Sequence, residues 1–326
     1  MPKDHYVPQF YLRNFQIPSQ PQWVFWYQRG RKATPKAIES RAQLRDFEKL
    51  SVEAGGLKHD SVSKRLKEIE NNVAPVIAKL IACEDLQLSA KEWSEICLFV
   101  SHLISRGPSG RQETINAFQS ADIMRAKVMA KNKEAFHATM RESGNPYRDD
   151  EIEEIRQKTL EFEKHYKIKR KDNFFKDYSL AMSLLAGELG SQCLLQKHPV
   201  LIKTSSQKEF ITSDNPVVFA CDEGHYERGS GLGLENSLLY LAISPNRALL
   251  LVNRSPKKNV VTVPGKQVEA FNSEVMTYAR DSLFSRTYEK KIEEAFNKTV
   301  ARQAETVIVE NANREILRVS GNELAE

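Results

Sequence analysis

Four residues have the types and positions that could carry catalysis: His5, His102, Arg106 and Asp214. A histidine titrates near neutral pH, so it can donate or accept a proton or bind a metal ion. A carboxylate at a strand end can act as a base or a metal ligand, and an arginine binds anionic groups through its planar guanidinium. This combination suits phosphate chemistry. We therefore expect a phosphate-directed hydrolase, either a nuclease or a nucleotide hydrolase.

His5 begins an aromatic segment, residues 5–15, which we call the N-terminal motif. It contains four aromatic side chains and a proline, so much of it has to be buried. In such a packed environment a small change in the pKa of His5 would make it an acid, a base or a ligand. The alternative is a core histidine whose ring nitrogens bond to the backbone, which is common for buried histidines.

A short polar segment separates two apolar runs within residues 210–218. Ser213, Asp214 and Asn215 precede Pro216, and the residue before a proline is restricted to extended or turn conformations. We expect Asp214 to project from a strand end into a cleft, with Ser213 and Asn215 binding the substrate. The alternative is ordinary turn chemistry, since small polar residues between strands usually stabilise a turn.

Two pairs of polar residues with helical spacing complete the candidate set. His102 and Arg106 are four residues apart near a predicted helix end, so they share one face. Arg106 would clamp an anionic group from there, although the helix dipole alone also favours cations at that end. Asn272 and Arg280 are eight residues apart and also share a face. We expect both to bind the substrate, with an ordinary surface helix as the alternative.

The sequence names no cofactor. It contains no P-loop, no G-x-G-x-x-G fingerprint, no G-x-S-x-G elbow and no H-E-x-x-H zinc motif. A divalent metal ion is compatible with the expected hydrolase, but its identity and its ligands stay unknown.

The composition is that of a folded protein. The chain has 326 residues, of which 40% are hydrophobic and 28% charged, with a net charge of +5. No apolar run approaches the roughly 20 residues that cross a bilayer, so we expect no membrane partner. The start of the chain lacks the apolar core of a signal peptide. The four cysteines are scattered singly, which favours a reducing, cytoplasmic environment.

The elements that would position the candidate residues form three sub-regions of one large domain. Residues 1–60 are irregular and β-rich. Residues 61–196 carry apolar side chains at helical spacing. Residues 197–326 contain short apolar runs separated by turn residues, followed by helices. This order predicts an α+β fold with an N-terminal strand segment, a helical middle region and a C-terminal, mostly antiparallel sheet with flanking helices.

Individual elements follow from periodicity and from end signals. Ser89 with Glu92 three residues later is a capping box, so a helix begins there and ends near residue 107. The other predicted helices cover residues 61–83, 111–140, 149–170, 174–195, 267–283 and 288–311. The predicted strands cover residues 22–27, 200–202, 210–212, 217–219, 238–243, 248–252, 260–263 and 316–319.

Two basic clusters, residues 164–171 and 254–258, are the evidence for a nucleic-acid or nucleotide partner. The first follows an acidic stretch, so residues 148–172 carry eight basic and eight acidic side chains. We expect a solvated helix with paired charges there. Sequence-independent binding of RNA or DNA by the two clusters is the alternative.

These motifs resemble the bacterial domain of unknown function 4238 family. The resemblance spans roughly residues 3–290 and is specific at the N-terminal motif and at the Ser-Asp-Asn-Pro turn. The other matching segments are residues 106–108, residues 243–245, and Asn272 ahead of Arg280. The resemblance implies that His5, Arg106, Asp214 and Asn215 belong to recurring motifs, as expected of a site assembled from distant segments. It implies no activity, because the function of the family is unknown.

Three functions stay open at this point. Besides the hydrolase and the nucleic-acid binder, the chain could be a non-catalytic regulatory or interaction protein of a bacterial defence or toxin module. Residues 149–171 would then contact a partner, and the polar turn would be a structural corner. The hydrolase requires His5 and Asp214 close together and open to solvent. The interaction protein allows both to be buried and bonded to the backbone.

Overall fold

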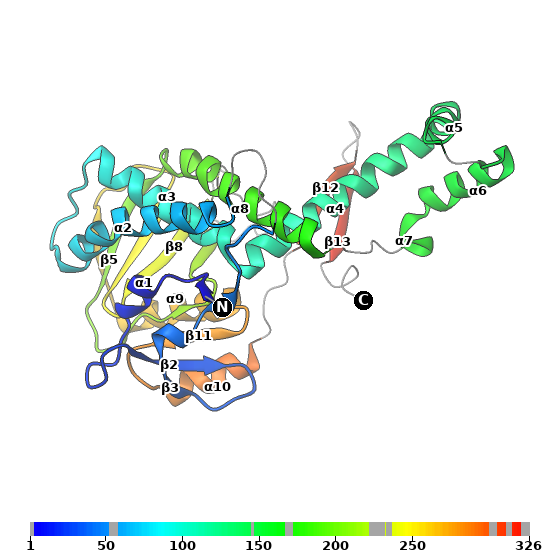
Figure 1. The fold of residues 1–326 in the computed structure, drawn as a ribbon. Helices are drawn as coiled ribbons and strands as arrows, with labels where there is room; N and C mark the ends of the chain where they lie inside the picture. Colours follow the sequence, from blue (N-terminus) through cyan, green and yellow to red (C-terminus); the bar gives the residue numbers. More distant parts are fainter. Residues whose placement is uncertain are drawn as a thin grey trace. The chain divides into compact units, whose positions relative to one another are not determined.

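The computed structural model of the chain describes residues 3–51, 58–144, 147–166, 172–221, 232, 237–299, 305–310 and 315–320. By its internal contacts the chain divides into two compact units (Figure 1). Unit 1 comprises Met1–Arg111 and Lys176–Arg302, and unit 2 comprises Gln112–Phe175 and Gln303–Glu326. The expectation of one large domain with three sub-regions stays a prediction.

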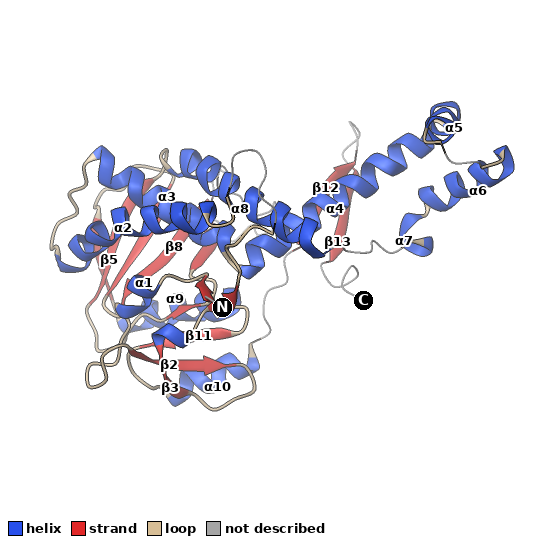
Figure 2. Ribbon diagram, viewed as in Figure 1, coloured by secondary structure: helices blue, strands red, loops and turns tan. Residues whose placement is uncertain are grey.

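The predicted α+β class is confirmed (Figure 2). Strands dominate the N-terminal part, helices the middle, and strands with flanking helices the C-terminal part. The N-terminal elements are β1 (Lys3–His5), α1 (Gln9–Arg13), β2 (Trp23–Gln28), β3 (Thr34–Ala37), the 3-10 helix η1 (Ile38–Ser40) and β4 (Gln43–Arg45).

Helix α1 was not predicted from the sequence. It begins directly after Pro8, whose fixed φ suits a helix start. Tyr11, Leu12 and Phe15 follow on one side and are fully buried, so the short helix is stabilised by packing rather than by its length. The expected burial of the N-terminal motif is confirmed.

Three long helices lie over one face of the larger sheet of unit 1 (Figure 1). They are α2 (Ser61–Ala82), α3 (Ala90–Arg106) and α8 (Asp172–Leu194). The apolar stripe of α2 is buried as its spacing predicts. At the start of α3, the Ser89 hydroxyl accepts from the Glu92 backbone N–H and the Glu92 side chain accepts from the Ser89 N–H. The predicted capping box is therefore confirmed.

The larger sheet has the strand order β10-β5-β9-β8-β7. Only the β10–β5 pair is parallel, so the prediction of a mostly antiparallel sheet is confirmed. The inner strand β8, between β9 and β7, is almost completely buried, which explains its nearly continuous apolar sequence. The strands are β5 (His198–Thr204), β7 (Val217–Cys221), β8 (Ser237–Ser244), β9 (Arg247–Val252) and β10 (Val260–Val263).

A second, four-stranded sheet has the order β3-β2-β11-β6. It pairs strands from the N-terminal part of unit 1 with strands from its C-terminal part. It includes β6 (Thr212–Ser213) and β11 (Ser282–Ser285). Helix α9 (Gly265–Tyr278) ends before β11, so the prediction of a helix up to residue 283 is wrong at its end. Leu283 and Phe284 are fully buried, and their strand pairs with β2 on one side and β6 on the other.

The predicted helix over residues 288–311 is also too long. Helix α10 (Lys290–Lys298) ends early, and β12 (Glu305–Glu310) pairs antiparallel with β13 (Glu315–Ser320). The β-branched residues of β12 suit a strand. The expected strand at the C-terminal end, residues 316–319, lies within β13.

Unit 2 is built mainly from four helices: α4 (Pro108–Lys131), α5 (Lys133–Glu142), α6 (Asp149–Leu160) and α7 (Phe162–His165). The helix predicted over residues 111–140 is divided at Asn132, whose side-chain oxygen accepts from the Ala135 N–H and caps α5. The buried core of this unit consists of Ala130, Phe136 and Ile152. Within the described residues, no helix of the chain combines the length and apolar character needed to span a membrane.

Candidate functional site

Asp214 holds a structural corner. Its side chain is 6% exposed, and its two carboxylate oxygens accept from the backbone N–H groups of Arg280, Asp281 and Ser282 at 2.8–3.0 Å. Burial raises the pKa of Asp214 to about 6, although these three hydrogen bonds favour the charged form. The carboxylate thus fixes the connection between α9 and β11, and this geometry argues against its expected role as an open base or metal ligand.

The other residues predicted around the turn also bond to backbone. The Ser213 hydroxyl donates to the carbonyl of Asn215 at 2.7 Å and accepts from its N–H at 3.1 Å. The Asn215 amide donates to the carbonyl of Tyr278. Asn272 accepts from the Ile211 N–H and also donates to the carbonyl of residue 209. The structure therefore brings these predicted residues together, but as a hydrogen-bonded corner.

Arg280 stands apart from this pattern because its side chain is exposed. Its guanidinium lies 3.4 Å from the exposed carboxylate of Asp281, and exposed pairs of this kind contribute little to stability. No other predicted substrate-binding residue of the corner is as accessible.

His5 does not bond to Asp214. Its Nε2 lies 3.1 Å from the carbonyl oxygen of Glu39, and the Gln9 amide lies 3.3 Å from the same nitrogen. The ring is half-buried, and burial lowers the pKa of His5, so the neutral form prevails at neutral pH. Among the described residues, the hydrogen bonds of the two side chains have no partner in common.

The N-terminal motif reaches the polar turn through tyrosines instead. The Tyr11 hydroxyl donates to the carbonyl of Ala242 at 2.6 Å and lies 2.7 Å from the Thr212 hydroxyl. The pKa of Tyr6 is raised by burial and then by the charges of Asp214 and Asp281. Both specific motifs therefore meet in the fold, and the buried Tyr11 hydroxyl links them directly through Thr212.

Arg106 clamps the backbone of the N-terminal motif. It is buried, and its guanidinium donates to the carbonyls of Tyr6 at 3.0 Å and His5 at 2.6 Å. A third donor reaches the carboxylate of Glu70 at 2.7 Å. Arg106 therefore lies beside the backbone of His5, and its nitrogens donate to the protein itself.

His102 faces α8 rather than the N-terminal motif. A Cβ atom added at Gly187 would overlap its ring, and its Nε2 lies 3.7 Å from a carboxylate oxygen of Glu188. Neither ring nitrogen has a hydrogen-bond partner among the described residues. Burial lowers the pKa of His102 to about 4, so the ring is neutral at neutral pH and fills the α3–α8 interface.

A charged cluster that the sequence did not reveal lies next to the N-terminal motif. We call it the Arg111–Glu48 cluster, and its members are Asp4, Glu48, Glu70, Arg106 and Arg111. Glu48 is 7% exposed, its N–H donates to Asp4 at 2.9 Å, and burial raises the pKa of its side chain to about 7. Burial also lowers the pKa of Arg111 to about 10. The sequence signal was weak, because Glu48 and Arg111 are 63 residues apart.

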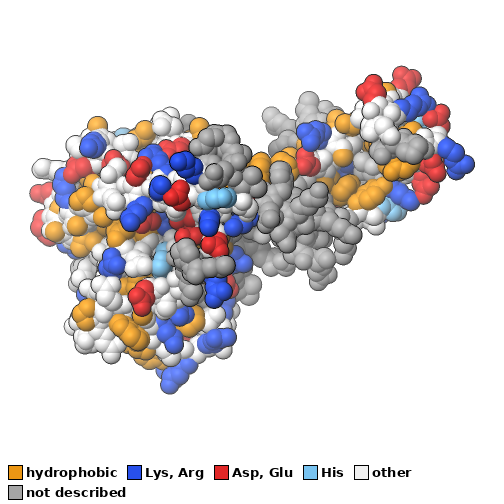
Figure 3. All heavy atoms as spheres, viewed as in Figure 1, with side chains coloured by type: hydrophobic (Ala, Val, Ile, Leu, Met, Phe, Trp, Pro, Cys, Tyr) orange, Lys and Arg blue, Asp and Glu red, His pale blue; other side chains and the backbone are white. Residues whose placement is uncertain are grey.

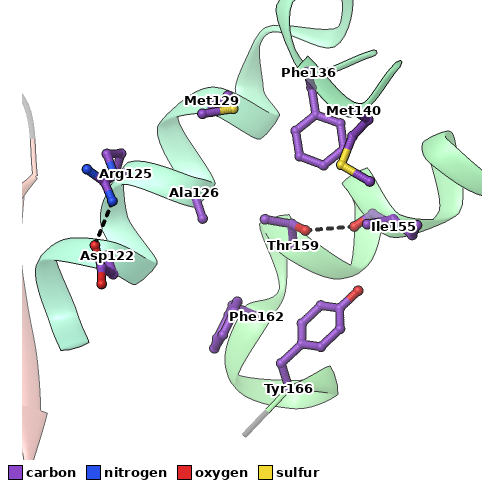
Figure 4. A pocket seen from close by; sticks show the side chains of 10 residues that line it. All are labelled: Asp122, Arg125, Ala126, Met129, Phe136, Met140, Ile155, Thr159, Phe162 and Tyr166. Carbon is purple, nitrogen blue, oxygen red and sulfur yellow. Dashed lines mark hydrogen bonds and ion pairs between the residues drawn. The ribbon is translucent and has the colours of Figure 1, made fainter. Parts of the chain in front are cut away.

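A pocket of about 410 Å³ lies in unit 2, between α4, α5, α6 and α7 (Figure 4). Its walls are mostly apolar. The polar groups at its edge are paired: Arg125 donates to Asp122 at 2.9 Å, and the Thr159 hydroxyl donates to the carbonyl of Ile155 at 2.8 Å. The apolar lining includes Met129, Phe136, Met140, Ile155, Phe162 and Tyr166.

The segment expected to be a solvated charged helix forms one wall of this pocket. Helices α6 and α7 carry the predicted charge pairs, such as Lys158 with Glu154 at 2.6 Å. Their apolar residues were visible in the sequence, but only the tertiary arrangement shows that they face α4 and α5. Of the two basic clusters, residues 167–171 lie outside the described residues, so the expectation of a shared basic face stays a prediction.

No metal centre is found in the described part of the chain. There, no group of three or more histidine, cysteine, aspartate or glutamate side chains is arranged to hold a metal ion.

Comparison with known proteins gives one match. A family model described as "Protein of unknown function (DUF4238)" covers residues 3–319. No curated protein and no solved structure matches the chain.

Proposed function

Since the chain belongs to the DUF4238 family of proteins of unknown function, we propose from its own geometry that it is a non-catalytic interaction protein that binds a partner through unit 2. The apolar pocket between α4 and α7 carries this proposal. As part of the same proposal, the protein acts in the cytoplasm as a component of a bacterial defence or toxin module.

The use of the polar motifs supports a non-catalytic role. A catalytic base needs a free lone pair within reach of a substrate. The oxygens of Asp214 accept backbone N–H groups, and the donors of Arg106 are bound to two carbonyls and a carboxylate. These residues stabilise the fold, which is the outcome expected for an interaction protein.

The pocket has the properties of a binding surface. The unit buries few residues, so the apolar side chains around its small core stay partly exposed. Figure 3 shows hydrophobic side chains gathered on the described part of unit 2 between charged ones. Methionine side chains adapt to different apolar partners, and two of them, Met129 and Met140, line the pocket. An unfilled apolar surface of this kind marks an interaction site.

The geometry favours an amphipathic peptide segment as the partner. A volume of about 410 Å³ accommodates one or two large apolar side chains, which is the anchor of a helix-in-groove complex. The ion pair between Lys127 and Glu163, at 2.6 Å, links α4 to α7. Together with Asp122 and Arg125 it provides a polar rim around the apolar centre, as protein interfaces have.

Selection of displayed peptides on the intact protein tests this proposal. We expect enriched peptides to carry two large apolar residues three or four positions apart. Their affinity should fall at least about tenfold for Met129→Glu. Val128→Glu is the matched control, because Val128 is 56% exposed and does not line the pocket. Failure to enrich any peptide, or equal binding to both variants, would exclude the pocket as the partner site.

Phosphate-directed hydrolysis is the second candidate, and one observation favours it. Glu48 and Arg111 carry buried polar atoms without hydrogen-bond partners among the described residues, close to the N-terminal motif. In this candidate function, Glu48 would transfer the proton and Arg111 would bind the anionic group of the substrate. Asp214 would take no part in the reaction. A panel of phosphomonoesters, nucleotides, single-stranded DNA and RNA, with divalent metal ions added, tests it. Turnover by the wild type that Glu48→Gln abolishes would favour this candidate over the first.

A further inference from the structure

Arg111 is a buried cation with unpaired donors. It lies in the first turn of α4 and is 5% exposed. Its guanidinium carbon lies 3.5 Å from the centre of the Phe47 ring, and Nη1 donates to the Phe47 carbonyl. Nε and Nη2 have no hydrogen-bond partner in the part of the chain that the structure describes. A buried donor left unpaired is costly, so an acceptor from outside the protein is expected at this edge.

Glu48 presents another unpaired, buried atom in the same cluster. Its Oε1 is buried without a hydrogen-bond partner among the described residues. The Nη2 atom of Arg106 is 4.0 Å away, but that arginine is already bound to Glu70 and to two carbonyls. When its carboxyl group is protonated, Glu48 supplies one more donor next to Arg111.

The unpaired edge of Arg111 indicates the ligand. Nε and Nη2 form the planar fork that binds two oxygens of one oxyanion. A tetrahedral phosphate has a further oxygen that can accept from a protonated carboxyl group. We propose that Arg111 and Glu48 form a binding site for a phosphate group, with the fork of Arg111 on two oxygens and protonated Glu48 on a third. This site belongs to unit 1 and does not depend on a partner at unit 2.

Binding at this site has to be linked to proton uptake. An ionised Glu48 would repel the anion, whereas the protonated form donates to it. The charged groups that act on Glu48 are Asp4 on β1, Glu70 on α2, Arg106 on α3 and Arg111 on α4. Burial holds the pKa of Glu48 near neutrality against the two arginines, so the site gains its third donor as the pH falls through this range.

Calorimetric titration of the full chain tests the proposal, with sulfate and inorganic phosphate as probes. Sulfate has the same tetrahedral shape and does not titrate between about pH 5 and pH 8. We expect the wild type to bind both ions and Arg111→Gln to bind them at least about tenfold more weakly. Arg31→Gln removes the same charge from an exposed position of unit 1 and should bind like the wild type.

Glu48→Gln separates this site from a purely structural cluster. Glutamine donates a hydrogen bond at every pH, so sulfate affinity should no longer depend on pH in this variant, whereas in the wild type it should rise toward pH 5. This measurement also decides the case if Arg111→Gln fails to fold. An unchanged pH dependence in Glu48→Gln, equal loss in both arginine variants, or no binding by the folded wild type would overturn the proposal.

Titration with a nucleoside monophosphate shows whether the phosphate group belongs to a metabolite or is the free ion. Tighter binding of the nucleotide than of inorganic phosphate, again lost in Arg111→Gln, assigns the site to a phosphorylated metabolite. Equal binding assigns it to the free ion. Nucleotide binding that Arg111→Gln leaves unchanged would place the nucleotide elsewhere and count against the site.

Discussion

The polar corner of unit 1 and the apolar pocket of unit 2 satisfy opposite physical requirements. At the corner, Asp214 is buried and its oxygens are bonded to backbone N–H groups. In the pocket, apolar side chains such as Met129 stay partly exposed. Reactive residue types in a recognisable motif thus serve folding, whereas the apolar pocket that we propose as a partner site lies in a segment that carries no such motif. Substitutions at the corner should reduce stability, and substitutions in the pocket should reduce binding.

Asp214→Ala should cause the largest loss of stability. Removing the carboxylate leaves three backbone N–H groups without their acceptor, so we expect the free energy of unfolding to fall by about 3–5 kcal/mol. Denaturant unfolding measures this loss. Asp281→Ala is the control, because its exposed carboxylate forms an ion pair with the exposed Arg280, and its effect should stay below about 0.5 kcal/mol. A stable Asp214→Ala variant would contradict the structural role.

Gly187→Ala should have the next largest effect. An added Cβ would overlap the ring of His102, and overpacking of this kind costs about 2–3 kcal/mol. His102→Ala in the same chain should recover part of the loss by making room. Gly107→Ala is the control, since its Cβ would lie 4.0 Å from the nearest atom, the Leu103 carbonyl oxygen. Equal effects of the two glycine substitutions would mean that α3 and α8 are not packed as described.

The pH dependence of stability should reveal His102. Its pKa is about 4 in the folded chain against 6.5 for the free side chain, so the unfolded chain binds the proton more readily. The contribution of the neutral His102 ring to the free energy of unfolding is fully present above about pH 6.5 and is lost as the pH falls toward 4. Between about pH 7.5 and pH 5 we expect the wild type to lose about 2 kcal/mol more than His102→Gln. Parallel pH profiles of the two proteins would show that His102 is not buried as a neutral ring.

Met129→Glu should have the smallest effect on stability. Met129 is 37% exposed at the edge of the pocket, so a carboxylate there stays hydrated, and we expect a change below about 0.5 kcal/mol. Thermal unfolding of this variant and of Val128→Glu checks the expectation. A large loss in Met129→Glu would show that the pocket side chains belong to the folding core.

The sequence predicted those elements whose signals are local. The stripe of α2 and the capping box at Ser89 depend on residues within a few turns of one another. Strand β11 was missed because its pairing with β2 joins residues more than 250 positions apart, such as Ser282 and Gln28. Its short sequence continues the apolar pattern of the preceding helix, and tertiary pairing decides its conformation.

The candidate site was predictable only in part, for the same reason. The sequence placed Asp214 at a strand end, which the structure has, but it could not show that the side chain turns inward to residues 280–282. It expected Arg106 and His5 in one cleft, whereas the contact in the structure is made by the backbone carbonyl of His5. Glu48 and Arg111 carried no local signal, because only the fold brings the loop after β4 to the start of α4.

Titration of a selected amphipathic peptide against the wild type, Met129→Glu and Val128→Glu tests the central claim most directly. Partner binding through the pocket predicts that the peptide binds the wild type and Val128→Glu with the same affinity. Binding to Met129→Glu should be at least about tenfold weaker at unchanged stability. Equal affinity for all three proteins would contradict the claim, because the partner surface would then lie outside the pocket of unit 2.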